Sequence, residues 1–271
     1  MTLNFHVRHE VTPERTSEVL QAIARGDTFD HVTQFERQMG RLRQLGLVAG
    51  TGADFELTSL ADTLLRLTDT KPQLLPDLMH YVHYTRWSET EPLEHAFLWT
   101  YRAFCDRLVE QGGCELTHQW IEATVTHLLG VIRESPHFAY AVTVETKKGA
   151  ISLSTDSLNG VLHWLRPLRP PVIENDTFTR RHFCPPELLL LALGYVAQQT
   201  EAEIGIDLLL TPERREMLCH VCLLEPAALD RALDWMLPLY PQVIEPGTRA
   251  GVYGRFVRLH KMPELSDLIT Q

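Results

Sequence analysis

Residues 33–58, TQFERQMGRLRQLGLVAGTGADFELT, place an amphipathic helix, a glycine-rich turn and a short alternating strand in immediate succession. Four apolar residues recur at helical spacing, which predicts one buried helical face: Phe35, Met39, Leu42 and Leu45. Val48 and the run 55–57 then flank the sequence GTGAD, which is typical of a short hairpin. This succession is the one expected for half of a winged-helix domain.

The residues on either side of this stretch complete the same pattern. Thr12 followed by Pro13 predicts a capped helix, because threonine caps helices well and proline is favoured in the first helical turn. After the hairpin, Thr58 or Ser59 begins a further helix. The order helix, link, helix, hairpin, helix predicts an N-terminal winged-helix domain over residues 1–70.

The rest of the chain divides into three parts. Residues 71–137 are helical and rich in aromatic residues, without an obvious strand, so we expect a helical linker domain. Residues 138–183 form a connecting segment that contains one helix, starting at Ser154 or Thr155. Residues 184–271 repeat the first pattern as a second winged helix. Its expected elements are helices that begin near Pro186, Pro212 and Pro226, and strands at 242–244 and 252–259 around the turn PGTRAG. The predicted fold class is mainly α with small β-hairpins (α+β), with winged-helix domains at both ends joined by a helical domain.

The charge limits what the chain can bind. It carries a formal net charge of -10 at pH 7, and its acidic residues are spread along the whole length. A stand-alone, tight DNA binder needs a strongly basic segment, so any nucleic-acid contact must come from a local patch or be shared with a partner. The five cysteines are scattered and odd in number, which favours free thiols in a reducing compartment. No apolar run reaches the roughly 20 residues of a membrane span, and no signal-peptide pattern occurs, so we expect a cytoplasmic protein.

The polar face of the helix at 33–44 is the strongest candidate site. Arginine and glutamine make bidentate contacts with guanine and adenine edges in the major groove, so we predict contact with double-stranded DNA. The residues of this face are Gln34, Arg37, Gln38, Arg41 and Gln44. The alternative is a solvated helix face on which the arginines pair with nearby carboxylates.

Further cations lie outside this helix. Phosphate contacts are expected from basic pairs in loops and from the C-terminal hairpin: Lys147, Lys148, Arg180, Arg181, Arg249 and Arg255. The alternative for the loop pairs is a solubilising role. The third C-terminal helix instead carries Asp230, Arg231 and Asp234, and its carboxylates would repel phosphates. We therefore expect that helix to contact protein.

Two groups contain the residue types of metal sites. Cys219 and Cys222 form a C-x-x-C, but they lie in an apolar run with an incomplete second pair, which favours buried core thiols over zinc. His80 and His83 have the spacing of ligands on one helix face, yet their aromatic neighbours favour a helix–helix contact. No Walker A loop, dinucleotide fingerprint or nucleophile elbow occurs. The sequence predicts no cofactor and no metal, and it gives no signature of an enzyme.

Three segments carry a further pattern. They are the opening FHVRHEVTPERTSEVLQAI, with His9, Glu10 and Thr12, then LVAGTGADFELTSLADTLLRL, and the tail CLLEPAALDRALDWMLPLYPQVIEPGTRAGVYGRFVRL. They resemble, over most of the chain, a bacterial family that begins with a Gly-His-Glu-Thr-Phe motif and is encoded beside PAPS-reductase-like enzymes of DNA phosphorothioation and phage-defence islands. The chain departs from the family at Val7 and Arg8, where the family has a glycine. The resemblance implies a DNA-handling accessory subunit.

These observations predict a DNA-binding accessory subunit of a bacterial DNA-modification or phage-defence system. The N-terminal winged helix would contact DNA, and the acidic remainder would contact other proteins of the complex. One alternative is a protein–protein adaptor without nucleic-acid binding, which the even spread of negative charge favours. Another is a metal-dependent DNA nickase that uses histidines of the central domain.

Overall fold

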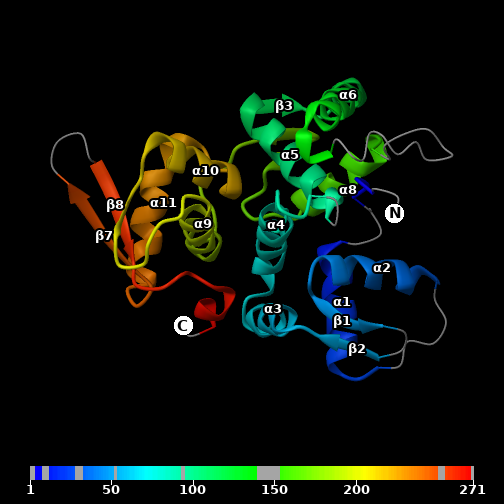
Figure 1. Ribbon diagram of the computed structural model, residues 1–271, viewed down its shortest axis with the longest axis horizontal. Helices are drawn as coiled ribbons and strands as arrows, with labels where there is room; N and C mark the ends of the chain where they lie inside the picture. The colour runs from blue at the N-terminus through cyan, green and yellow to red at the C-terminus, as the bar shows by residue number, and fades with distance from the viewer. Residues whose placement is uncertain are drawn as a thin grey trace.

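The computed structural model describes residues 4–7, 12–27, 33–51, 54–92, 95–138, 153–249 and 254–269. These residues are mainly helical, with small antiparallel sheets of two or three strands, which confirms the α+β class. Figure 1 shows an N-terminal unit in blue, a central group of helices from cyan to green, and a C-terminal unit from yellow to red. No helix among the described residues is long and apolar enough to cross a lipid bilayer.

The N-terminal unit has the predicted order of elements. It consists of α1 (Pro13–Ala24), α2 (Thr33–Gln44), β1 (Val48–Thr51), β2 (Asp54–Leu57) and α3 (Ser59–Thr70). Thr12 caps α1 by accepting a hydrogen bond from the backbone of Arg15, and Pro13 occupies the first helical turn. Thr58 caps α3, and its hydroxyl also donates to the carbonyl of Gly46 at 2.7 Å. Helix capping thus fixes how the hairpin leads into α3.

The described residues of the central unit form the helices α4, α5, α6 and α8, with a small sheet at one end. Its elements are η1 (Pro72–Leu74), α4 (Leu75–Thr85), α5 (Ala96–Gln111), β3 (Gly113–Glu115), α6 (His118–Glu134), η2 (Pro136–Phe138), α8 (Thr155–Leu165), β4 (Ile173–Glu174) and β5 (Thr177–Thr179). The expectation that residues 71–137 contain no strand is wrong, because β3 pairs with β5. Three residues that pair with a segment about 60 positions away show no periodicity, so no local pattern indicates this strand.

The predicted connecting segment, in its described part, joins this central unit. α8 packs against α4, α5 and α6, and β5 lies between β3 and β4 in the sheet. Gly160 in α8 is needed for close packing, because a Cβ there would lie 2.0 Å from the carbonyl oxygen of Val7. The N-terminal segment that contains Phe5 and Val7, both buried, therefore lies directly on α8.

The C-terminal unit has three helices and a three-stranded sheet. Its elements are α9 (Pro186–Gln199), β6 (Asp207–Leu209), α10 (Pro212–Cys222), η3 (Pro226–Ala228), α11 (Leu229–Met236), η4 (Leu237–Leu239), β7 (Ile244–Arg249) and β8 (Gly254–Leu259). The strand order is β6–β8–β7, with antiparallel pairing throughout. The three helices begin where the sequence predicts, whereas β6 was not predicted.

Part of the segment that was predicted to form the C-terminal turn is a strand. We expected PGTRAG to form the turn, but Pro246 to Arg249 continue β7, and the last two residues of that stretch lie outside the described residues. Gly247 serves packing rather than turning, because a Cβ there would lie 2.0 Å from the ring of Phe256 on the paired strand. A glycine within a strand thus marks a close approach by another side chain as well as a bend.

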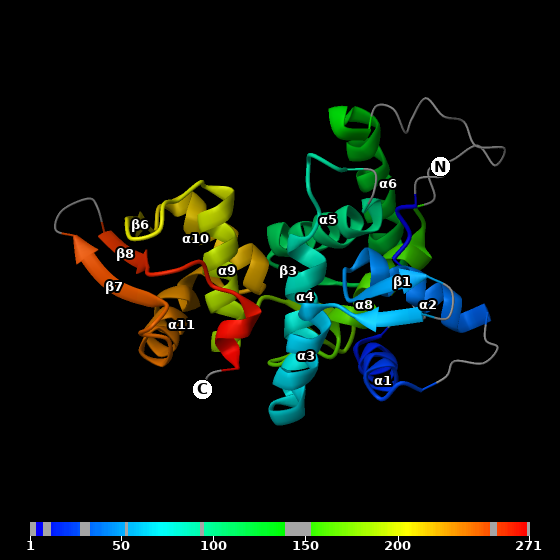
Figure 2. The ribbon, with the colours of Figure 1, turned by 60° about the horizontal axis from the view of Figure 1, so that its bottom comes forward.

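The three units are packed together. α4 contacts both α9 and α10, and the last turn, η6 (Leu265–Leu268), packs against α3. Figure 2 shows α4 and α9 side by side and η6 lying between the C-terminal unit and α3. Apolar side chains of α4, α5 and α9 are fully buried, including Leu78, Phe104 and Leu188.

A buried ion pair lies at this junction. The guanidinium of Arg181 donates to the carboxylate of Asp77 at 2.7 Å, and both side chains are 1% exposed. Arg181 also donates to the carbonyl of Cys222 at 2.7 Å, and the second oxygen of Asp77 accepts from the backbone of Arg169. The pair therefore joins α4, the segment before α9 and the end of α10.

We expect Asp77→Asn to lower the free energy of unfolding by about 3–5 kcal/mol, because it leaves the Arg181 charge buried without its counter-ion. Chemical denaturation measures the change. The matched control is Asp176→Asn, which breaks the exposed pair between Asp176 and Arg166 and should change the free energy by less than about 1 kcal/mol. Equal effects of the two substitutions would contradict this role of the buried pair.

Candidate functional site

The predicted DNA-binding face of α2 is partly buried. Arg41 is only 6% exposed and donates to the carbonyl of His6 at 2.8 Å and to Gln44 at 2.7 Å. Its guanidinium lies 4.3 Å from the ring centroid of Phe97 on α5. Gln38 is 7% exposed. The prediction that Gln38 and Arg41 reach DNA is therefore wrong, because both side chains are buried, whereas Gln44 is half-buried and its contact with DNA stays a prediction.

The side chains of the first turn of α2 lie outside the described part of the structure. Gln34 and Arg37 belong to this turn, so their contact with DNA stays a prediction. Arg43, which the sequence did not single out, is exposed at the other end of the helix. Its guanidinium lies 5.2 Å from the ring centroid of Phe55 on β2.

The sequence also predicted phosphate contacts by basic residues outside α2. Arg181 is buried with Asp77, and Arg180 donates through Nε and Nη2 to the carbonyl of Val109. The prediction for Arg181 is wrong because its guanidinium is buried, whereas Arg180 is half-buried and its contact with phosphate stays a prediction. Lys147 and Lys148, and the side chain of Arg249, lie outside the described residues, and their roles stay predictions.

Arg255 lies on β8 beneath the acidic face of α11. It donates to a carboxylate oxygen of Asp234 at 2.7 Å and to the carbonyl of Asp230, while Arg215 on α10 donates twice to the carboxylate of Asp230. The side chains of Asp230 and Asp234 are 56% and 67% exposed, against 18% for Arg255. The outward surface is thus carboxylate, which contradicts a phosphate contact through Arg255.

An apolar surface adjoins these carboxylates. Trp235 is 65% exposed, Leu239 46% and Phe183 37%, and the rings of Phe183 and Trp235 meet edge to face with centroids 6.0 Å apart. Large side chains exposed together mark interaction sites more often than isolated ones do. The sequence feature that indicates this surface is a tryptophan, Trp235, directly after Asp234 on the polar side of the helix.

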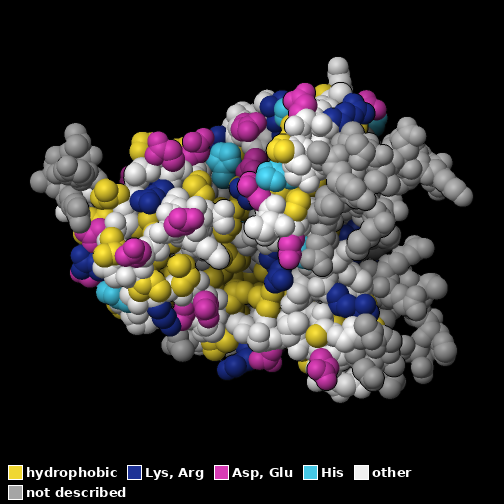
Figure 3. All heavy atoms as spheres, viewed as in Figure 1, with side chains coloured by type: hydrophobic (Ala, Val, Ile, Leu, Met, Phe, Trp, Pro, Cys, Tyr) yellow, Lys and Arg dark blue, Asp and Glu magenta, His cyan; other side chains and the backbone are white. Residues whose placement is uncertain are grey.

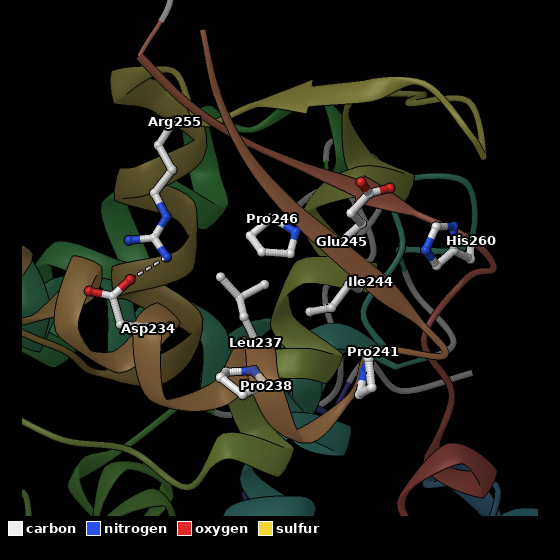
Figure 4. Close-up of a pocket in the computed structure, with 9 residues that line it drawn as sticks. All are labelled: Asp234, Leu237, Pro238, Pro241, Ile244, Glu245, Pro246, Arg255 and His260. Atoms are coloured by element: carbon white, nitrogen blue, oxygen red, sulfur yellow. Dashed lines mark hydrogen bonds and ion pairs between the residues drawn. The ribbon is translucent and has the colours of Figure 1, made fainter.

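A groove lies beside this surface, between η4 and the β7–β8 hairpin. It has a volume of about 340 Å³, and Figure 4 shows its apolar side chains pointing toward one another: Leu237, Pro238, Ile244 and Pro246. The Arg255–Asp234 pair closes one end, and Glu245 and His260 lie at the other. We call the surface formed by Phe183, Trp235, Leu239 and this groove the docking face.

The histidines of α4 are structural. His80 is fully buried, with Nδ1 bonded to the hydroxyl of Tyr101 at 2.9 Å and Nε2 to the carbonyl of Val221 at 2.8 Å. His83 is also buried and donates through Nδ1 to the carbonyl of Met79. These contacts disfavour a catalytic role for the pair, because both nitrogens of His80 are already bonded within the protein.

The cysteines of the C-x-x-C are also buried. Cys222 hydrogen-bonds to Cys184, and burial raises the pKa of Cys219 to about 11, so this thiol stays protonated near neutral pH. Within the described ranges, no group of three or more histidine, cysteine or acidic side chains is arranged to hold a metal ion. The arrangement is that of core thiols.

No family model, curated protein or solved structure matches this chain. The proposed function therefore rests on the contacts and exposure of the described side chains.

The histidines also predict how stability depends on pH. Burial lowers the pKa of His80 to about 3, with the Arg181 charge adding to the shift, and burial lowers that of His83 to about 4. Their pKa in the unfolded chain is near 6.5, so the unfolded state binds more protons below that pH, and acid destabilises the fold. We expect the free energy of unfolding to fall as the pH drops from about 6.5 toward 4.

In His83→Gln this pH dependence should be less steep by about 1.4 kcal/mol per pH unit between roughly pH 6 and 4.5. Denaturant titrations at a series of pH values measure the slope. His118→Gln on α6 is the control, because the His118 side chain is 78% exposed. Identical slopes in wild type and His83→Gln would show that His83 is protonated equally in both states.

Proposed function

We propose that this protein is an accessory subunit that binds a partner protein through the docking face of its C-terminal unit. The observation that carries the proposal is the exposure of Trp235 and Leu239 beside an apolar groove whose lining includes the exposed carboxylates of Asp234 and Glu245. Exposed tryptophan is a frequent source of binding energy at protein interfaces. No catalytic role is needed to explain this surface.

The order of elements supports a winged-helix description of the C-terminal unit. Three helices precede a two-stranded wing, β7 and β8, and a short strand, β6, pairs with the inner strand of the wing. In that frame α11 occupies the position of the helix that enters the major groove in DNA-binding members. Here that helix presents Asp230 and Asp234, which would repel phosphates, so the same scaffold suits protein binding.

The chemistry of the surface defines the partner. The docking face is apolar at its centre, and the exposed carboxylates of Asp234 and Glu245 lie at the two ends of its groove. A complementary partner presents apolar side chains flanked by lysine or arginine. The net charge of -10 would also attract a basic partner over a longer range.

The biological setting of the proposal comes from the sequence. The resemblance to a family encoded beside phosphorothioation and phage-defence genes supports a cytoplasmic role in a bacterial DNA-modification or defence complex. The partner is then an enzyme or a further subunit of that complex. DNA would be handled by the assembly as a whole.

We expect the protein to bind the purified product of a neighbouring gene, and the double variant Trp235→Ala/Leu239→Ser to bind it at least about tenfold more weakly. Removing the two exposed side chains takes away apolar contact area while leaving the buried core in place. Titration calorimetry measures Kd. The control is Val131→Ser on α6, which removes an apolar side chain 38% exposed and far from the docking face in sequence. Unchanged affinity in the double variant would refute this site.

A second candidate function is duplex DNA binding by the N-terminal unit. If this unit is a winged helix, α2 is its recognition helix, because it directly precedes the β1–β2 hairpin. The exposed Arg43 on the same helix favours this candidate. Burial of Arg41 and Gln38 limits any contact to the two ends of the helix.

For this candidate, Gln34→Ala/Arg37→Ala should weaken binding to duplex DNA and reduce the salt dependence by about one unit of slope, because one phosphate-neutralising charge is lost. Band shifts over a range of salt concentrations measure both effects. Arg66→Ala on α3 removes another exposed arginine and serves as the control. Absence of any shift at low salt would exclude this function.

A further inference from the structure

A second pocket lies where the central helices meet the C-terminal unit. It has a volume of about 320 Å³ and is lined from α4, α5, α9 and α10. Figure 3 shows acidic and histidine side chains gathered at this junction. We call it the junction pocket, and the residues that matter are Tyr84, Arg102, Asp106, Tyr195, Glu216 and His220.

Asp106 organises the floor of this pocket. It accepts a hydrogen bond from the hydroxyl of Tyr84 at 2.5 Å and one from Nδ1 of His220 at 2.9 Å. Because a carboxylate can only accept, the Nδ1 of His220 must carry the proton. The other ring nitrogen, Nε2, lies 4.0 Å from a carboxylate oxygen of Glu216.

Tyr195 on α9 adds a buried hydroxyl to the wall of the pocket. The residue is only 5% exposed, and its hydroxyl has no hydrogen-bond partner among the described residues. Burial raises the pKa of Tyr195, so the group remains a neutral hydroxyl near physiological pH. A buried polar group without a partner is costly, and a ligand that bonds to it removes that cost.

The charges of the pocket favour a cation. Glu110, Glu213 and Glu216 bring three carboxylates to its lining in addition to Asp106. The one arginine of the lining, Arg102, lies 3.8 Å from Asp106, and its guanidinium is 5.6 Å from the ring centroid of Tyr84. Arg102 is therefore already balanced by the floor of the pocket, and Glu110 lies 3.6 Å from Arg107, which leaves the carboxylates of Glu213 and Glu216 in excess.

We propose that the junction pocket binds a guanidinium or ammonium group. Such a group only donates hydrogen bonds, and the pocket offers it acceptors at the hydroxyl of Tyr195 and the carboxylate of Glu216. Its positive charge offsets the excess of carboxylates. The cation comes either from a small free molecule such as agmatine or from an arginine or lysine side chain of a bound protein.

This site is separate from the docking face. The docking face is formed by α11, η4 and the β7–β8 hairpin with Phe183, whereas the junction pocket is formed by α4, α5, α9 and α10. Failure of one proposal leaves the other unaffected. The two sites also have different probes, a whole partner protein for the first and a small cation for the second.

The test is calorimetric titration of the full chain with agmatine, with N-acetyl-arginine amide and with a short arginine-containing peptide. N-acetyl-citrulline amide is the matched neutral probe, because it has nearly the same shape without the charge. Tyr195→Phe removes only the unpartnered hydroxyl, Glu216→Gln removes one charge, and Glu203→Gln changes an exposed glutamate that does not line the pocket.

We expect the arginine probes to bind saturably and the citrulline probe to bind at least about tenfold more weakly. Tyr195→Phe should weaken the binding of the arginine probes by about tenfold, Glu216→Gln by a smaller factor, and Glu203→Gln should have no effect. Binding of agmatine indicates a free ligand, and binding of the peptide alone indicates a partner side chain; both support the site. Equal binding of citrulline, or unchanged affinity in Tyr195→Phe, would overturn the proposal, as would the absence of saturable binding by every arginine probe.

Discussion

The buried ion pair between Asp77 and Arg181 determines how the C-terminal unit is placed on the central helices. Its atoms hold three segments that are distant in sequence: α4, the strand-bearing stretch before α9, and the carbonyl at the end of α10. Taking two charges out of water is costly, so a pair of this kind adds little net stability compared with apolar residues of similar size. The pair nevertheless favours one arrangement of the two units, because an arrangement that separates Asp77 from Arg181 leaves a buried charge without its counter-ion.

The two proposed sites follow from that placement. The junction pocket exists only where α5 and α10 approach each other, since Asp106 comes from the first and His220 from the second. The docking face lies away from the junction on α11 and the hairpin, and it needs only the C-terminal unit itself. A partner bound at the docking face and a cation bound in the junction pocket thus contact opposite ends of the same three-helix unit, whose core contains α9.

The arginines explain why nucleic-acid binding is difficult to read from this sequence. Arg41, Arg180, Arg181 and Arg255 all have types and positions that suit phosphate or base contacts. In the structure each donates to a carbonyl or carboxylate of the protein itself. A guanidinium has five donors and a long apolar stem, so it serves equally well to join two packed segments. Sequence position alone does not distinguish these uses.

The sequence by itself determined where several helices begin and which face of α2 is buried. Capping by Thr12, Thr58 and Thr211 fixed the starts of three helices, and the apolar period from Met39 to Leu45 fixed the buried face of α2, because these effects act within one or two turns. Only the tertiary structure decided which polar side chains remain available. Burial of Arg41 against Phe97, pairing of β3 with β5 and the meeting of Asp106 with His220 all join residues more than 50 positions apart. Such contacts depend on how the elements pack, and no periodicity or local spacing encodes them.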